Sequence, residues 1–304
     1  MEPIRTSVLE RRPVRILLPT LLALLILLGT GAGFMVYKMT HPETALEALT
    51  PTNFLLAYSE LRWKAPSGRE ISGWWMPGIR GAPAVILCHG YGSNRSEVLG
   101  VASTLRENGY NTLAFDFPAH GFVKGSSSLG LYERHEVLSA IQYVRSRMNV
   151  HPERMGLWGV SMGAYAALWA AAHSDIVTAV AVDSAYRSVR DMVRIQTAEL
   201  LHFDTQIVSF FTHLGFSLYF AIPPWEDTAI PLQPLEGKTV LYIVGMGSPR
   251  LGTLTRSMYA SAPPIKDILI FSHSANTSMY GTEKFAYEDQ MLNFFKRSLP
   301  LVEQ

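Results

Sequence analysis

The sequence predicts an α/β fold with a mostly parallel, doubly wound sheet and a small helical lid, preceded by one transmembrane helix. Three observations lead to this prediction. Short apolar runs alternate with helical patterns through most of the chain, which is typical of βαβ units. A Gly-x-Ser-x-Gly motif stands where one such run passes into a helix. Residues 16–37 form an uncharged apolar segment of 22 residues, long enough to cross a bilayer core of about 30 Å.

The composition fits one large domain beyond this apolar segment. The chain has 304 residues, and 48% of them are hydrophobic, which is enough to bury a substantial core. The 26 basic and 25 acidic residues give a formal net charge of +1, so nothing favours a nucleic-acid partner. Cys88 is the only cysteine, which excludes an intrachain disulfide and a CxxC metal or redox site. We therefore expect no nucleic acid, no metal and no cofactor.

The apolar segment at 16–37 is interpreted as a membrane anchor. Four arginines lie within residues 1–15 and only Lys38 follows closely, so the positive-inside rule places the N-terminus in the cytoplasm. The folded domain is then expected on the far side, periplasmic or extracellular. The alternative is a cleaved signal peptide, whose apolar region is shorter and ends in small residues, as at 29–33. The apolar run resumes at 34–37 without a clear Ala-x-Ala site, which favours an uncleaved anchor.

A linker at 38–54 is expected to join the anchor to the domain at 55–304. The expected strands are residues 61–65, 70–76, 83–88, 112–115, 155–160, 177–182, 239–244 and 267–271. The expected helices are residues 97–108, 132–148, 162–172, 189–201, 207–219 and 284–295. The stretch 185–234 interrupts the alternation, and an insertion there would lie above the carboxyl ends of the strands, where ligands bind. We interpret it as a lid; an ordinary surface excursion is the alternative.

The motif Gly159-Val160-Ser161-Met162-Gly163 carries the strongest chemical signal. A predicted strand runs directly into it and a predicted helix runs directly out, which is the context of a nucleophile elbow. The sharp turn presents the serine hydroxyl at the tip of the sheet, and its glycines avoid side-chain clashes. Ser161 is therefore the candidate nucleophile.

A second motif, His89-Gly90-Tyr91-Gly92, follows the buried strand at 83–88. In elbow-type sites one oxyanion-hole donor follows the nucleophile and the other comes from a loop after an earlier strand. The N–H groups of Met162 and Tyr91 are the corresponding candidates. His89 is interpreted as a residue that braces the loop, because the Ser–acid–His chain order places the base after Ser161.

Three blocks in order resemble the α/β-hydrolase superfamily, especially its serine aminopeptidase-like and prolyl-oligopeptidase-like bacterial members. They are LCHGYGSN at 87–94, DFPAHG at 116–121 and GVSMG at 159–163. The resemblance covers roughly residues 55–298 and implies hydrolysis of an ester, amide or thioester through an acyl-serine. In the second block Asp116, His120 and Gly121 match the family's D-x-R-G-H-G, whereas Pro118 replaces its arginine and Ala119 its glycine. A different loop shape is therefore expected there.

The resemblance also implies an acid and a histidine, and this chain departs from the family at both positions. The acid usually follows the strand at 239–244 as G-x-x-D, where this chain reads Gly-Met-Gly-Ser248, and no Asp or Glu occurs from 246 to 266. After His213 only His273 remains as a base, and in the family's usual register Asn276 takes the histidine position. Asp183 is an alternative acid, unless it caps the turn that follows its strand.

Two functions are compatible with these residues. The first is a membrane-anchored serine hydrolase in which Ser161 attacks and His273 is the base. The aromatic lid and the anchor then favour a small-molecule or lipid-like acyl substrate. The second is a non-catalytic pseudohydrolase, a membrane-tethered binding or scaffold protein, which Ser248 and Asn276 favour. A nucleotide-binding function is excluded because neither a P-loop nor a strand-linked G-x-G-x-x-G is present.

Overall fold

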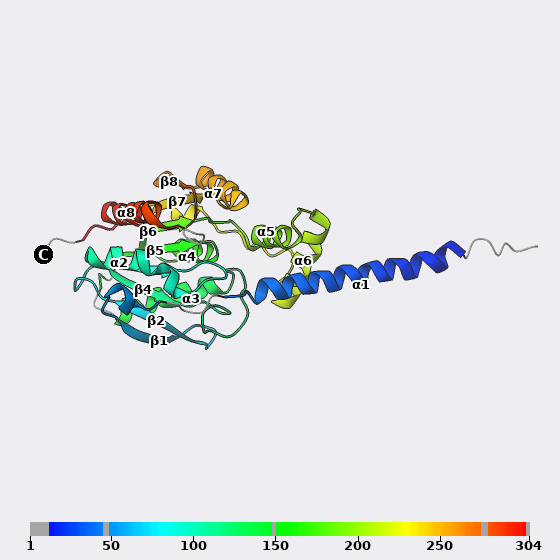
Figure 1. Cartoon of the computed structure of the whole chain (residues 1–304), viewed down its shortest axis with the longest axis horizontal. Helices are drawn as coiled ribbons and strands as arrows, with labels where there is room; N and C mark the ends of the chain where they lie inside the picture. The colour runs from blue at the N-terminus through cyan, green and yellow to red at the C-terminus, as the bar shows by residue number, and fades with distance from the viewer. Residues whose placement is uncertain (1–11, 45–48, 148–149, 152, 275–278, 302–304) are drawn as a thin grey trace, which may run out of the picture.

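The computed structural model describes residues 12–44, 49–147, 150–151, 153–274 and 279–301 (Figure 1). One eight-stranded sheet forms the centre of the domain, in the order β1-β2-β4-β3-β5-β6-β7-β8. β2 is antiparallel to both of its neighbours, and every other pair is parallel. The predicted mostly parallel, doubly wound sheet is therefore confirmed.

Each expected strand is present. The strands are β1 (Ser59–Lys64), β2 (Glu70–Met76), β3 (Ala84–Cys88), β4 (Asn111–Phe115), β5 (Met155–Val160), β6 (Val177–Asp183), β7 (Thr239–Gly245) and β8 (Lys266–Phe271). The helices are α1 (Arg12–Thr40), α2 (Leu99–Glu107), α3 (Glu133–Arg147), α4 (Met162–Ala172), α5 (Val189–Leu201), α6 (Gln206–Tyr219), α7 (Pro249–Ser261) and α8 (Gly281–Ser298). The short 3-10 helices are η1 (Pro51–Phe54), η2 (Arg95–Val98) and η3 (Gln233–Leu235). α7 is absent from the elements that the sequence predicted.

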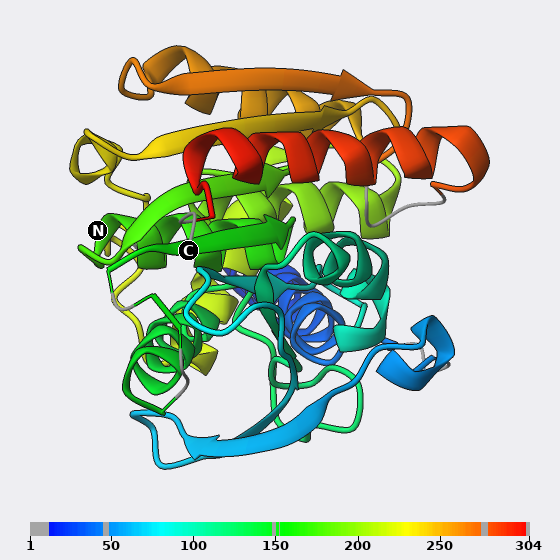
Figure 2. The same cartoon turned by 90° about the vertical axis from the view of Figure 1, so that its left-hand side faces the viewer.

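The sheet separates two apolar cores, because successive side chains of a strand point to opposite faces. Ile86 of β3 belongs to the core beneath α3 and α4, whereas its neighbours Val85 and Leu87 belong to the core beneath α2 and α8. β3, β4 and β5 are buried along their whole length. α8 crosses the near face of the sheet in Figure 2. With both faces covered, chemistry is confined to the loops at the strand ends.

α1 leaves the domain as one long helix beside α5 and α6 (Figure 1). Within the part of the chain that the structure describes, it is the one helix long and apolar enough to cross a membrane, over Leu17–Thr40. Its last turns nevertheless lie against the domain: Met35, Val36 and Met39 are buried. The carbonyl of Thr40 accepts a hydrogen bond from the Ser127 N–H at 2.8 Å. The helix therefore continues into the segment predicted as a linker.

The predicted insertion at 185–234 holds α5 and α6, close to their expected bounds. It leaves the sheet at the carboxyl end of β6, which pairs with the end of β5 next to Ser161. α6 lies along α1, and a Cβ built on Gly215 of α6 would contact Val36 of α1 at 3.3 Å. The lid and the end of α1 therefore form one layer on the side of the candidate site.

Candidate active site

Ser161 occupies a strained turn between β5 and α4. Its φ of 50° and ψ of −111° lie in a region that non-glycine residues rarely adopt. Its N–H donates to the Asp183 carbonyl at 2.8 Å. A Cβ at Gly159 would overlap the backbone of Gly163, so the turn requires glycine. The residue is 4% exposed. These features are those of a nucleophile elbow.

The start of α4 lies directly against the loop that follows β3. A Cβ at Gly163 would overlap the carbonyl oxygens of Cys88 and His89, so only glycine permits this approach. The contact brings the backbone of Met162 beside the loop that carries Tyr91. Met162 is in the first helical turn, where N–H groups have no intrahelical acceptor. The two candidate oxyanion donors thus come from neighbouring segments.

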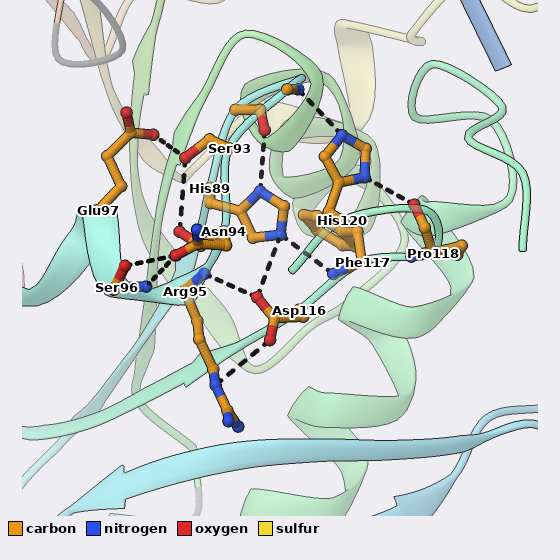
Figure 3. Close-up of polar contacts among 12 residues, drawn as sticks. His89, Ser93, Asn94, Arg95, Ser96, Glu97, Asp116, Phe117, Pro118 and His120 are labelled. Atoms are coloured by element: carbon orange, nitrogen blue, oxygen red, sulfur yellow. Dashed lines mark hydrogen bonds and ion pairs between the residues drawn. The ribbon is translucent and has the colours of Figure 1, made fainter. Parts of the chain in front are cut away.

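His89 braces that loop rather than facing a substrate (Figure 3). Its Nε2 accepts the Phe117 N–H at 3.1 Å, so the ring proton is on Nδ1, which donates to the Gly90 carbonyl at 2.8 Å. Burial lowers the pKa of His89 to about 3, with the neighbouring His120 as a smaller cause. A neutral imidazole with a hydrogen bond at each ring nitrogen holds the two backbone segments in place and cannot relay a proton to Ser161.

His120 also has both ring nitrogens hydrogen-bonded to backbone groups, and one of them belongs to the loop that carries Tyr91. Its Nε2 accepts the Gly92 N–H at 3.0 Å, and its Nδ1 donates to the Pro118 carbonyl at 2.6 Å. Burial lowers the pKa of His120 to about 4. Since the Gly92 N–H is engaged in this way, the Tyr91 N–H stays the candidate oxyanion donor of the loop.

The block at 116–121 retains backbone conformations that favour glycine. Ala119 has a φ of 60° and Gly121 a φ of 55°, and a Cβ at Gly121 would contact the Asp116 carboxyl group at 2.9 Å. Ala119 therefore adopts the left-handed conformation at the position where the family has glycine, at some conformational cost.

Asp116 is committed to a buried ion pair. Its Oδ1 accepts the Arg95 N–H at 2.7 Å, and its Oδ2 lies 3.3 Å from Arg95 Nε. The Arg95 guanidinium stacks over Trp74, 4.0 Å from the ring centre. Figure 3 shows this pair beside His89. Asp116 thus links the second block to β2 and η2 rather than to a catalytic histidine.

Asp183, the alternative acid, is fully buried at the end of β6. Its carboxylate accepts hydrogen bonds from Ser184 Oγ at 2.8 Å and from Tyr287 Oη at 3.1 Å. Tyr287 in turn accepts the Trp158 Nε1–H at 3.2 Å. This network connects the strand next to Ser161 with α8. His273 has a different carboxylate partner.

The partner of His273 is Glu283. Its Oε2 lies 2.7 Å from His273 Nδ1, and its Oε1 accepts the His273 N–H at 3.1 Å. The hydrogen bond from the imidazole lowers the pKa of Glu283. A carboxylate on Nδ1 leaves Nε2 as the proton-accepting atom, which is the orientation a catalytic base needs. Sequence reasoning missed Glu283, although an acidic residue at the start of a predicted helix ten positions after His273 was a visible signal.

The relay from Ser161 to Glu283 lacks one contact among the described residues. No hydrogen bond joins Ser161 to His273 within the described residues. Asn276 lies outside the described residues. Ser248 follows β7, as expected, and precedes the first residue of α7, so no carboxylate stands at that position. Nor do three His, Cys, Asp or Glu side chains gather to hold a metal ion in the described ranges.

Comparison with known proteins identifies relatives of the part of the chain that contains the elbow. The family model for the α/β-hydrolase fold matches residues 83–217. The uncharacterized protein YfhR of Salmonella typhimurium is 32% identical over 139 residues, which cover 44% of this chain and 46% of that protein. The thiohydrolase aneE of Aspergillus aculeatus is 27% identical over 127 residues, 40% of each protein. The chain thus matches less than half the length of these curated relatives.

Among solved structures, the esterase Pf2001 of Pyrococcus furiosus superposes with a TM-score of 0.65 at 21% identity, over 86% of this chain and 99% of the esterase. At this identity the likeness shows the fold alone, and the predicted α/β-hydrolase fold is confirmed. The family match contains Tyr91 and Ser161 but ends before β7. His273 and Glu283 therefore rest on this structure alone.

Proposed function

We propose that the chain, which belongs to the α/β-hydrolase superfamily, is a membrane-anchored serine hydrolase that cleaves an ester, amide or thioester through an acyl-serine. The elbow carries this proposal. A serine held at a φ of 50° between a strand and a helix stores strain that a structural serine does not need.

In the proposed reaction Ser161 Oγ attacks the acyl carbonyl while His273 Nε2 accepts the serine proton. The carbonyl oxygen becomes an oxyanion that the N–H groups of Tyr91 and Met162 stabilise. Glu283 stabilises the imidazolium that forms and holds its tautomer. The imidazolium then protonates the leaving group, and water hydrolyses the acyl-serine by the same proton transfers in reverse.

The anchor and the lid support a lipophilic acyl substrate. The uncharged segment of α1 is long enough to span a bilayer, and the arginines before it favour a cytoplasmic N-terminus with the domain on the other side. The lid is rich in aromatic residues, among them Phe210, Phe216 and Tyr219. An esterase and a thiohydrolase among the similar proteins support an ester or thioester bond.

A pseudohydrolase is the second candidate, and two observations favour it. Ser161 has no hydrogen bond to His273 within the described residues, and the family's usual acid position after β7 holds Ser248. A serine without a base in reach is a poor nucleophile. In that case the domain would bind an acyl ligand or a partner at the membrane without turnover.

A fluorophosphonate probe distinguishes the two functions. We expect the full-length protein in detergent micelles to be labelled, the label to be absent from Ser161→Ala, and turnover of a p-nitrophenyl ester to be lost in His273→Ala. Ser161→Ala and wild-type samples with matching circular dichroism spectra control for folding. A folded wild-type protein that takes up no label contradicts the hydrolase and favours the pseudohydrolase.

A further inference from the structure

The part of α1 that projects from the domain is too short to cross a bilayer by itself. Residues 17–31 project from the domain and are exposed apart from the half-buried Leu28, whereas Ala32 is the first side chain of the helix buried against the domain. At 1.5 Å per residue these 15 residues span about 22 Å, against a hydrocarbon core of about 30 Å. Arg15 prevents an extension at the other end. The span must therefore continue to about residue 36.

Those last turns of the span are the ones that α6 covers. Gly215 of α6 faces Val36 and Ala32 of α1, and α6 lies beside the domain-proximal part of α1 in Figure 1. If Val36 is at the level of the acyl chains, then α6 is at that level too. The lid helix cannot stand clear of the membrane while α1 spans it.

The surface of α6 suits that position. Residues 205–225 contain no Asp, Glu, Lys or Arg. A lipid-facing stripe, defined here as Ile207, Phe210, Leu214 and Leu218, follows one face of the helix at spacings of three and four residues. Ile207, Phe210 and Leu218 are 65%, 63% and 71% exposed, an unfavourable arrangement in water.

Exposed aromatic residues flank the stripe. Phe203 precedes α6 and Trp225 follows it, 58% and 82% exposed. Aromatic residues at the ends of a hydrophobic segment are typical of a membrane–water interface, because their rings suit the headgroup level. The charged residues Asp204 and Glu226 stand immediately outside the uncharged segment.

We propose that α6 is a second membrane-contacting element, inserted in the leaflet on the domain's side with the lipid-facing stripe against acyl chains. The inference rests on the proposed anchor. It also deepens the proposed function, because the lid would then open toward the leaflet. Tyr91 Oη donates to the carbonyls of Lys38 and Met39 at 3.2 and 3.0 Å, so the candidate oxyanion loop is tied to the same end of α1. A substrate that partitions into the leaflet, such as an acyl lipid, fits this site best.

The test places a fluorophore at single cysteines of the full-length protein. Cys88, the only native cysteine, is fully buried, so introduced cysteines are labelled selectively with a nitrobenzoxadiazole maleimide. Phe210→Cys and Leu218→Cys report on the stripe, and Leu22→Cys reports on α1. Phe285→Cys is the matched control, because Phe285 is an exposed aromatic residue on α8, away from α1 in Figure 1. Each protein is reconstituted in phosphatidylcholine vesicles with and without doxyl-labelled phosphatidylcholine.

We expect the doxyl lipid to lower emission at residues 22, 210 and 218 at least about twofold, since interfacial helices bury their apolar face about 5–10 Å deep. Emission at residue 285 should not change. Quenching at residue 22 without quenching at residues 210 and 218 overturns the inference and leaves the anchor standing. In that case, blue-shifted emission at residues 210 and 218 would assign the stripe to a protein contact. No quenching at residue 22 overturns the anchor and this inference together, whereas probe labelling of Ser161 tests the hydrolase separately.

Discussion

Acidification is expected to destabilise this fold through His89 and His120, the two neutral histidines that hold the candidate oxyanion loop. Burial lowers their pKa values to about 3 and about 4, against about 6.5 in an unfolded chain. Their stabilising effect is complete above pH about 6.5 and is lost as pH falls toward 4, because both histidines then bind protons in the unfolded state but stay neutral in the folded state. Each pH unit costs about 1.4 kcal/mol per histidine. At pH 5 the two together cost roughly 4 kcal/mol.

Urea unfolding of the full-length protein in mild detergent, followed by tryptophan fluorescence, measures this loss at about pH 7.5 and about pH 5. The variant His120→Gln isolates one histidine, because its longer side chain carries an amide oxygen to the position of Nε2, where it can accept the Gly92 N–H without titrating. We expect the variant to lose about 2 kcal/mol less than the wild type between the two pH values. Equal losses in the two proteins would refute the assignment of His120 as a buried neutral brace.

Three further predictions concern single side chains. Ala119→Gly should stabilise the protein by about 0.5–1 kcal/mol in the same urea assay, because a φ of 60° strains alanine; Ala164→Gly, inside α4, is the control and should destabilise. Glu283→Gln should lower kcat of ester hydrolysis about 10²-fold with little change in KM, the lower end for a lost orienting acid, since the Glu283 side chain is 26% exposed; unchanged kcat would remove Glu283 from the relay. Tyr91→Phe should cost about 1 kcal/mol of stability, because it loses the hydrogen bonds to the end of α1; an unchanged urea midpoint would contradict that link.

The elbow could be predicted because its signal is local. The strand, the turn and the helix around Ser161 follow one another without a gap, and each has its own pattern in the sequence. The close approach at Gly163 is not local in the sequence, since it depends on two loops that meet at the ends of adjacent parallel strands. β3 and β5 are neighbours in the sheet although β4 lies between them in the sequence.

Glu283, the partner of His273, could not be predicted in the same way. The helix that carries Glu283 was expected to start at residue 284, whereas α8 starts at Gly281. The family's pattern directed attention to the loop after β7 instead, where Ser248 leads into α7. The sequence does carry a start signal for α7, a proline directly after Ser248, but this signal was not used. A side-chain pair that closes a ten-residue loop leaves no periodic trace in the sequence.

The docking of α1 was equally invisible, for a physical reason. Residues buried against lipid and residues buried against protein are both apolar. The hydropathy of residues 32–39 therefore predicts a membrane span in either case. Only the structure separates the free part of the helix from the part that Gly215 and Tyr91 contact. The separation changes the role that the proposed anchor would have. A helix that merely tethers a domain can be exchanged for another, whereas this one supplies two carbonyl acceptors to the candidate oxyanion loop and a buried surface to the lid.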